Sequence, residues 1–333
     1  MRQFIKAGFI WSGLLWPFFS YGQQLRAPLG ALPMQYNSSF AGEAGGPRIS
    51  SSFTLQPKLP WRTGHSYAWY TSYDQFIPAL RSGIGVMVGR GGMSSSDNYY
   101  YLSPDPLGRD DFKSNDYLFS VSIAPKISIR GKYKLSPSIE FTHGQEDFSR
   151  IRENEEAAPS NSSYSNYSNQ LRHWQSRIGL LFNTNKYYIG YSIAVLNRDI
   201  FSVQNQQRTN LITILDTSYS YTRPQRVMSY LQAGYTFQRT PQSKFSFTPQ
   251  VMVGIDHNSS YPIKLASVAF NLNFKYQQFI FGVNNQGWHV GWQTDKIRLM
   301  LTNSIGGDYH GNLSFRYLIK KTSGKSPNLA WGN

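Results

Sequence analysis

Hydrophobic and polar residues alternate one by one over long stretches of this chain. From Phe245 to Asp256, apolar side chains at the odd positions alternate with Ser, Thr, Gln, Met, Gly and Asp at the even positions. The segments Phe119–Arg130 and Asn312–Lys320 repeat the pattern. Because successive side chains of a β-strand point to opposite faces, this period of two predicts strands with one apolar and one polar face, and an all-β fold.

The alternating runs are about ten residues long. Ordinary strands are roughly five or six residues long, whereas a tilted strand that crosses a bilayer needs about 9–11. We predict about fourteen strands, and an even number is typical of bacterial single-chain outer-membrane barrels. The expected strands are Ile49–Leu59, Ser66–Phe76, Gly83–Arg90, Tyr117–Ile129, Leu135–His143, Gln175–Asn183, Lys186–Leu196, Ser229–Arg239, Phe245–Asp256, Ile263–Tyr276, Phe279–Asn285, Trp288–Thr294, Ile297–Ser304 and Asn312–Lys320.

Alternation alone is compatible with two architectures. In a soluble sandwich the apolar face would meet the core, whereas in a membrane barrel it meets lipid and the polar face lines the lumen. Strand length, an exported N-terminus and a high aromatic content favour a transmembrane antiparallel β-barrel with the apolar faces outward. In Ile263–Tyr276 the apolar phase shifts near Ala266 and Ser267, which predicts a β-bulge.

The connections between these strands have two lengths. The tight ones are Thr184-Asn185, Thr240–Lys244, Gln277-Gln278, Gln286-Gly287 and Asp295-Lys296, and the long ones are Gly91–Asp116, Gly144–Trp174 and Asn197–Met228. In outer-membrane barrels, short turns face the periplasm and long loops face outside. We therefore expect long extracellular loops and short periplasmic turns.

Composition agrees with a barrel. Charged residues are 15% of the chain, below the roughly 25% of soluble domains, and the chain has 23 Tyr, 21 Phe and 8 Trp but no Cys, which excludes disulfides and thiolate metal sites. Outer-membrane barrels carry girdles of aromatic residues at both membrane interfaces. The residues expected in such girdles are Tyr67, Trp69, Tyr117, Tyr187, Tyr188, Trp288 and Trp292.

The N-terminus has the three parts of a secretory signal peptide. Arg2 and Lys6 precede an apolar run, Ala7–Phe19, and small residues follow up to Gly22. The run is too short for the roughly 20 residues of a membrane-spanning anchor. We predict a cleaved signal peptide at 1–22, an N-terminal plug or lead into the barrel at 23–47, an outer-membrane barrel at 48–320 and a C-terminal tail at 321–333.

Motifs that carry chemistry are scarce. None of the six histidines has a metal-binding spacing, and Asp110-Asp111 and the cluster Glu153, Glu155 and Glu156 fit solvated loop charges better than hydrolytic or Ca²⁺-binding groups. We expect no catalytic residue, no metal and no cofactor. The net charge of +15 is spread over many strands, which favours outer-membrane lipid, lipopolysaccharide or acidic partners over nucleic acid.

Several segments resemble the PorP/SprF family of type IX secretion outer-membrane proteins. The family opens with L-Y-N-P-A-Y/F-A-G and then G-P-R, and residues 34–42 read MQYNSSFAG, with Ser38-Ser39 in place of Pro-Ala, before Gly46-Pro47-Arg48. The family's S-Y-D and A-L-x-x-G-x-G elements correspond to residues 72–74 and 79–85, and its R-x-Q-W element to TLQP at 54–57. The matching residues are Tyr36, Asn37, Phe40, Ala41, Gly42, Pro47, Arg48, Gln56, Ser72, Tyr73, Asp74, Gly83 and Gly85.

This resemblance implies a non-enzymatic barrel of the type IX secretion and gliding machinery. Its partners would be other secretion components and secreted cargo carrying a C-terminal targeting domain, and the motif residues would either shape an N-terminal plug or contact a partner. Two alternatives stay open. The barrel could be a pore or transporter for a small solute, or a lipase or protease with a tight His/Ser/Asp cluster at one rim.

Overall fold

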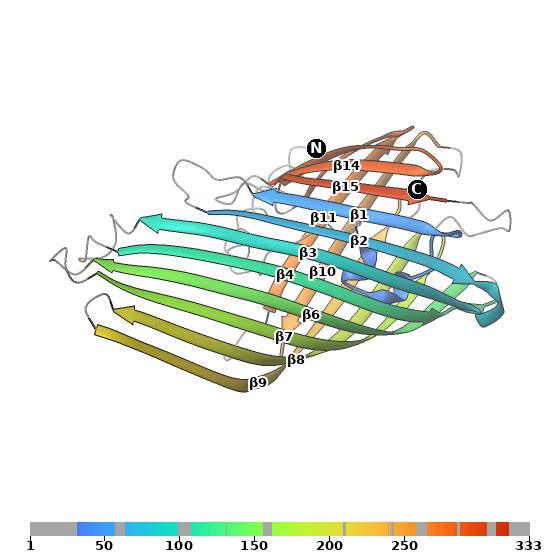
Figure 1. Cartoon of the computed structure of the whole chain (residues 1–333). Coiled ribbons are helices and arrows are strands. Elements are labelled where there is room, and N and C mark those ends of the chain that lie inside the picture. Colours follow the sequence, from blue (N-terminus) through green and yellow to red (C-terminus); the bar gives the residue numbers. More distant parts are fainter. Residues whose placement is uncertain are drawn as a thin grey trace.

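The strands of this chain form one antiparallel sheet that closes into a barrel (Figure 1). The computed structural model describes residues 32–56, 64–98, 108–130, 132–155, 162–208, 211–238, 240, 243–257, 265–284, 287–304 and 311–319. The predicted signal peptide at 1–22 and the predicted tail at 321–333 lie outside these residues. Among the described residues, no helix is long and apolar enough to cross a membrane.

The strands follow one another around the barrel in chain order. They are β1 (Arg48–Gln56), β2 (Gly64–Ile77), β3 (Ser82–Asn98), β4 (Gly108–Pro125), β5 (Ile127–Ile129), β6 (Tyr133–Glu155), β7 (Ser162–Asn183), β8 (Tyr187–Arg208), β9 (Leu211–Tyr235), β10 (Phe245–Asp256), β11 (Leu265–Tyr276), β12 (Phe279–Asn284), β13 (Gly287–Gln293), β14 (Ile297–Ser304) and β15 (Gly311–Leu318). Three short 3-10 helices accompany them among the described residues: η2 (Pro33–Gln35), η3 (Ser38–Phe40) and η4 (Pro78–Leu80).

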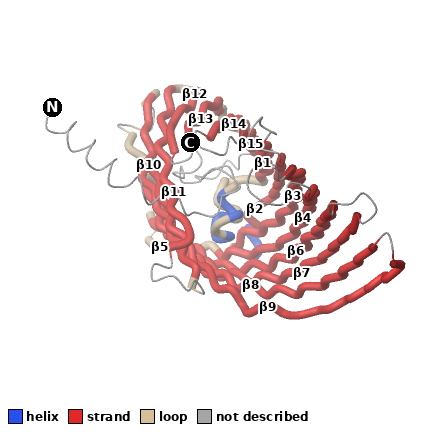
Figure 2. The backbone as a smooth tube through the Cα atoms, turned by 90° about the vertical axis from the view of Figure 1, so that its left-hand side faces the viewer, coloured by secondary structure: helices blue, strands red, loops and turns tan. Residues whose placement is uncertain are grey.

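Two pairings close the barrel. β1 pairs with both β2 and β15, which joins the first strand to the last. β4 and β5 both pair with β6 and are separated only by Lys126, so they act as one strand of the wall. The described barrel therefore has fourteen strands around its circumference, as the sequence predicts, and Figure 2 shows the ring from one end.

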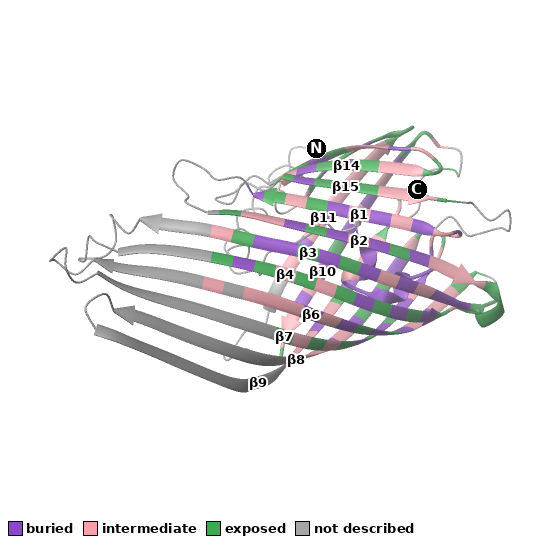
Figure 3. Ribbon diagram, viewed as in Figure 1, coloured by how far each residue is buried: buried purple, intermediate pink, exposed green. Residues whose placement is uncertain are grey.

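Apolar side chains face outward and polar ones face the lumen, which confirms the arrangement predicted from the alternation. On β4, Phe119 and Val121 are 49% and 41% exposed, whereas Ser120 and Ser122 between and after them are buried. The strands consequently alternate between buried and exposed residues along their length (Figure 3). The outward face matches the apolar band that a barrel presents to lipid.

An aromatic belt runs around part of the outer surface near the short turns. Phe247 stacks on Phe274, whose ring stacks on Phe281, with centroid separations of 4.7 and 5.2 Å. Tyr187 belongs to this belt, but Tyr188 does not: it is buried in the lumen, so its assignment to a girdle was wrong. The reason is geometric, since neighbouring residues of one strand point to opposite faces.

Three of the predicted short turns lie where the sequence predicts them, whereas Gly287, predicted in a turn with Gln286, is the first residue of β13. Tight connections at Thr184-Asn185, Gln277-Gln278 and Asp295-Lys296 join consecutive strands at one rim. The predicted bulge is also confirmed, because the pairing of β10 with β11 passes from Ser267 to Leu265 and leaves Ala266 without an opposite residue.

The prediction of three long loops was wrong. Most of Gly91–Asp116, Gly144–Trp174 and Asn197–Met228 is strand, and the pairing of β6 with β7 continues up to Glu155 and Ser162. These segments are polar and show little alternation. Beyond the membrane both faces of a strand meet water, so no apolar face remains to mark the strand in the sequence. The connections at 99–107, 156–161 and 209–210 lie outside the described residues.

A lysine on the lipid face should destabilise this barrel. Ile178 on β7 is 62% exposed and lies between Ile139 and Ile193 on the neighbouring strands. We expect Ile178→Lys to lower the free energy of unfolding by about 2–4 kcal/mol, because a charge then lies in hydrocarbon. Urea unfolding in lipid vesicles measures this loss.

The matched control is Asn185→Lys in the exposed β7–β8 turn. It adds the same charge outside the hydrocarbon and should leave stability within about 0.5 kcal/mol of the parent. Equal stability of the two variants would contradict the assignment of the lipid face.

Candidate functional site

Residues 32–47, here called the inner segment, fold inside the ring of strands. Figure 2 shows their short helices within the barrel. Pro33 begins η2, and Asn37 caps η3 by accepting a hydrogen bond at Oδ1 from the Ser39 N–H, 3.0 Å away. Gly42 follows in a left-handed conformation (φ 71°), which glycine adopts readily. These local signals compact the segment before it enters β1.

Polar side chains of the inner segment bind the barrel wall directly. Asn37 Nδ2 lies 3.4 Å from the carbonyl oxygens of both Leu180 and Tyr191, on β7 and β8. The hydroxyls of Ser38 and Ser39 lie 2.9 and 2.8 Å from Ser138 Oγ on β6. Asn37, Ser38 and Ser39 are fully buried, so these bonds offset the desolvation of the polar groups.

Asp74 joins the inner segment to the start of β1. Its Oδ1 accepts the backbone N–H of Gly42 at 2.8 Å, and its Oδ2 accepts Arg48 Nε at 2.7 Å. Arg48 Nη2 in turn donates to the Phe40 carbonyl at 3.3 Å. All of these side chains are buried. The structure thus brings together three of the sequence elements that were singled out separately, at 34–42, 46–48 and 72–74.

Glu43 forms a second buried ionic anchor. Its Oε1 lies 2.7 Å from Lys126 Nζ and accepts Ser136 Oγ at 2.9 Å, while Oε2 accepts Asn183 Nδ2 at 3.0 Å. Burial raises the pKa of Glu43, but the charge of Lys126 and hydrogen bonds from Lys126 and Ser136 outweigh burial and hold the pKa below its ordinary value. Glu43 is therefore a carboxylate at neutral pH.

Backbone carbonyls of the inner segment are also bound by the wall. Arg177 Nη1 donates to the Gln35 carbonyl at 2.9 Å and forms an ion pair with Glu140 at 3.2 Å. Ser192 Oγ donates to the Tyr36 carbonyl at 2.8 Å. The wall supplies donors to a short segment whose own helices are too brief to satisfy all of its carbonyls.

Glycines of β3 make room for the inner segment. A Cβ at Gly83 would overlap the Ala41 carbonyl, and a Cβ at Gly85 would overlap the Met34 side chain. Aromatic rings fill the space on the opposite side, where Phe40 packs edge-on against Tyr188 with centroids 5.8 Å apart. The period-two spacing of these glycines reflects a strand face that another part of the chain approaches closely.

Four of the predicted site residues lie elsewhere or act differently. Gln56 is buried at the far end of β1, where it accepts Ser66 Oγ at 2.9 Å. Tyr73 faces outward and donates to Gln75 Oε1 at 2.7 Å. Ser72 is buried on the inward face of β2, and the Pro47 carbonyl accepts the Ile319 N–H at 2.9 Å beside the closing strands.

The sequence reasoning missed Glu43, Lys126, Ser138, Glu140 and Arg177. All five are buried polar or charged residues, or pair with one, on the lumen side. A charged residue on the polar face of a strand, near its short-turn end, is the signal that could have marked Lys126. Its partner could not be deduced, because Glu43 is 83 residues away and inside the lumen.

One histidine contacts a serine. His257 lies 2.8 Å from Ser229 Oγ through Nε2, and the adjacent Asp256 accepts two N–H groups from Arg226, at 2.9 and 2.6 Å. In a hydrolytic triad a carboxylate orients the histidine. Here the Asp256 carboxylate accepts two hydrogen bonds from Arg226. Among the described residues, no group of three His, Asp or Glu could hold a metal ion.

Comparisons with known proteins agree with this fold. Residues 111–332 match the family model described as "Type IX secretion system membrane protein PorP/SprF". The motif residues between 36 and 85 precede the matched range. No curated protein sequence matched the chain.

Two solved structures resemble the chain over most of its length. The toluene transporter TbuX of Ralstonia pickettii is 10% identical, with a TM-score of 0.51 over 90% of this chain and 97% of that one. A FadL homologue of Pseudomonas aeruginosa is 9% identical, with a TM-score of 0.51 over 85% and 94%. At such low identity the likeness establishes the fold alone, an outer-membrane β-barrel.

Crowding at Gly83 should displace the inner segment. Because the chain has no cysteine, a single Ser39→Cys reports whether this buried position becomes accessible to a maleimide. We expect Gly83→Val to raise the labelling rate about tenfold, since overpacking costs about 1–3 kcal/mol. Gly91→Ala is the control, because a Cβ there would meet its nearest atom at an ordinary 3.4 Å. Equal labelling of both variants would contradict the packing described above.

The Glu43 anchor should be lost in acid. A carboxylate whose pKa is lower in the folded state stabilises that state above its ordinary pKa, and the stabilisation disappears as the pH falls through the lowered value. We expect Glu43→Gln to melt below the parent at about pH 7 and the two melting temperatures to converge once the pH falls below the lowered pKa of Glu43. Asp295→Asn, in an exposed turn, is the control. A constant Glu43→Gln difference across this range would contradict the charged anchor.

Proposed function

Because this chain belongs to the PorP/SprF family of type IX secretion system membrane proteins and is an outer-membrane β-barrel, we propose that it supports the secretion or surface attachment of cargo proteins that carry a C-terminal targeting domain. In this role it binds polypeptides and other components of the secretion system. It carries out no chemistry of its own and requires no cofactor.

The observation that carries the proposal is the inner segment. Its backbone and side chains form hydrogen bonds with β2, β6, β7 and β8. We propose that residues 32–47 close the lumen toward the periplasm, the side on which short turns lie in such barrels. A barrel closed in this way is suited to holding a partner rather than to passing a solute.

The rim opposite the short turns is the proposed partner surface. β6, β7, β8 and β9 are 22 to 25 residues long, about twice the length needed to cross the bilayer. β12 and β13, by contrast, have six and seven residues. The long strands therefore extend far past the short ones on one side of the barrel (Figure 1). A sheet edge of this kind offers backbone N–H and C=O groups to a protein partner.

A pore or transporter for a small solute is the alternative. The resemblance to the toluene transporter TbuX concerns the fold only. Planar-bilayer recordings separate the two functions. We expect the parent protein to be electrically silent and Gly83→Val to open, whereas a steady open channel in the parent would favour the transporter.

Direct binding of cargo is the decisive test. The detergent-solubilised barrel is immobilised and incubated with C-terminal targeting domains of secreted proteins from the same bacterium. We expect at least one domain to be retained, and not to be retained by an unrelated outer-membrane barrel in the same detergent. If no targeting domain binds, the proposed cargo role is wrong. The closed state of the lumen is tested separately, by the planar-bilayer recordings.

A further inference from the structure

The wall of the barrel is low at β12, β13 and β14, here called the short flank. These strands have six, seven and eight residues, whereas a tilted strand needs about 9–11 to cross a bilayer. The β12–β13 hairpin is limited at both ends, because β12 begins after the Gln277-Gln278 turn and its pairing with β13 ends at Asn284↔Gly287. The short flank is therefore shorter than a strand that spans a membrane.

The apolar outer side of this hairpin is only three rows high. Each row joins one outward residue of β12 to one of β13: Phe279 with Trp292, Phe281 with Val290, and Val283 with Trp288. Successive rows are about 7 Å apart along a strand, since alternate residues share a face. The first and third rows are then about 13 Å apart, whereas the apolar band of an ordinary barrel is about 25 Å tall.

Tryptophans mark both edges of this narrow band. Trp288 and Trp292, both expected in interfacial girdles, lie four positions apart on the outward face of β13. Trp292 Nε1 donates to Gln278 Oε1 of the β11–β12 turn at 3.0 Å, so the polar end of its ring is directed to the short-turn rim. Tryptophan favours the membrane–water interface, because its ring is apolar and its N–H is polar. The two interfaces are thus close together on this flank.

The opposite flank of the ring has its edge aromatics much farther apart. Near the short turns Tyr133 stacks on Phe182, with centroids 5.8 Å apart, and at the outer edge His143 packs against Trp174 at 4.3 Å. Tyr133 and His143 are ten positions apart on β6. That spacing is about 33 Å along the strand, which a tilt of roughly 40° reduces to about 25 Å. One barrel therefore presents two different apolar heights to the membrane.

Asn303 limits the band on β14 independently. The outward residues of this strand, from the turn upward, are Ile297, Leu299, Leu301 and Asn303. Asn303 pairs with Trp288 and so belongs to the third row. Six positions from the turn are about 20 Å along a strand, which with tilt reaches the middle of an ordinary hydrocarbon core of about 30 Å. An amide is costly to place there, so the sequence of β14 fits a thinner membrane.

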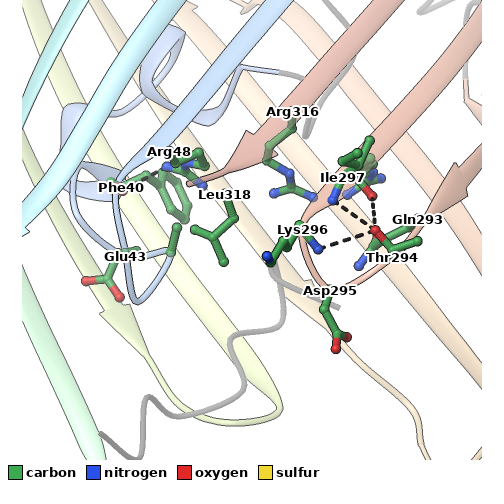
Figure 4. A pocket seen from close by; sticks show the side chains of 12 residues that line it. Phe40, Glu43, Arg48, Gln293, Thr294, Asp295, Lys296, Ile297, Arg316 and Leu318 are labelled. Carbon is green, nitrogen blue, oxygen red and sulfur yellow. Dashed lines mark hydrogen bonds between the residues drawn. The ribbon is translucent and has the colours of Figure 1, made fainter. Parts of the chain in front are cut away.

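β8 and β14 begin at turns with the same hydrogen bonds. Thr184 Oγ1 accepts the N–H of Tyr187 at 3.0 Å, and Thr294 Oγ1 accepts the N–H of Ile297 at 3.0 Å. Figure 4 shows the second turn, in which Thr294 Oγ1 also accepts the Lys296 N–H. The two strands can therefore be compared position by position from the same rim.

The sixth position after the first strand residue differs between the two flanks. It is Ile193 on β8 and Asn303 on β14. Ile193 pairs with Ile178, which is strongly exposed on the lipid face. Equal distance from the rim thus brings an aliphatic residue on the tall flank and a polar one on the short flank.

We propose that the short flank binds a locally thinned patch of the outer membrane, in which lipid headgroups and water reach Trp288 and Asn303. Ile193, at the same distance from the rim, stays in hydrocarbon. A bilayer adapts to a short apolar surface by thinning, at a modest cost for each ångström of mismatch. The partner of this surface is bilayer lipid. The inference is independent of the proposed cargo role, because it involves only the barrel and its membrane.

Spin labels at the two matched positions test this proposal. The chain has no cysteine, so Asn303→Cys and Ile193→Cys each give one labelling site in the full-length barrel, reconstituted alone in phosphatidylcholine vesicles. Oxygen concentrates in hydrocarbon and a nickel chelate stays in water. We expect the chelate to relax the label at 303 more than oxygen does, and the reverse at 193.

Two outcomes of the labelling experiment would overturn the proposal. Labels with equal depth at 303 and 193 would show that the membrane has one thickness around the barrel. A label at 303 that neither reagent reaches, together with spin–spin coupling between barrels, would show that a second copy covers the short flank.

A second measurement uses charge in place of a label. Lysine is compared with asparagine at each position, which at 193 requires both Ile193→Asn and Ile193→Lys. We expect the change from asparagine to lysine to lower the folding equilibrium constant at least about tenfold at 193 and less than about threefold at 303, because the penalty for a charge falls toward the interface. Urea unfolding in the same vesicles measures both changes. Equal penalties at the two positions would overturn the proposal.

Discussion

The pairing of β1 with β15 is the constraint on which the rest of this structure depends. Inside a bilayer no water is present to satisfy backbone N–H and C=O groups, so a sheet that crosses it must have no open edge. The register from Arg48↔Leu318 to Leu55↔Gly311 removes the last edge. Arg48 also binds Asp74 and the Phe40 carbonyl. Closure of the barrel and the seating of the inner segment therefore share Arg48.

The lumen wall differs from the core of a soluble barrel in a way that explains how it accommodates a folded segment. Its inward positions are mainly Ser, Thr, Asn, Gln and Gly, and a few charged residues occur among them. Such groups are costly to bury unless they are hydrogen-bonded. Ser138 and Ser192 meet this requirement through hydrogen bonds to the inner segment. Small side chains on the same face leave the volume that the segment occupies. The lumen wall therefore provides both the hydrogen-bond partners and the space for the inner segment.

The sequence predicts the strands well wherever one face meets lipid and the other meets the lumen. The bounds of β10 and β14 agree at both ends, because alternation persists through them. Prediction failed where that contrast is absent. The polar outer halves of β6 to β9 resemble loops in composition, and Tyr188 shares its residue type with outward-facing Tyr187. For the site, Asn37 and Gly42 could be identified as turn residues, but the pairing of Glu43 with Lys126 depends on tertiary contact and leaves no local pattern.

Because the strands differ in length, the wall of the barrel is taller on one side than on the other. β6 to β9 are more than twice as long as β12 to β14. The rim of the outer opening is therefore oblique, and the wall extends farther from the membrane on the side of the long strands. A macromolecule resting on that opening meets a tall sheet on one flank and the bilayer surface on the other. The outer opening is therefore accessible from the flank on which the strands are short.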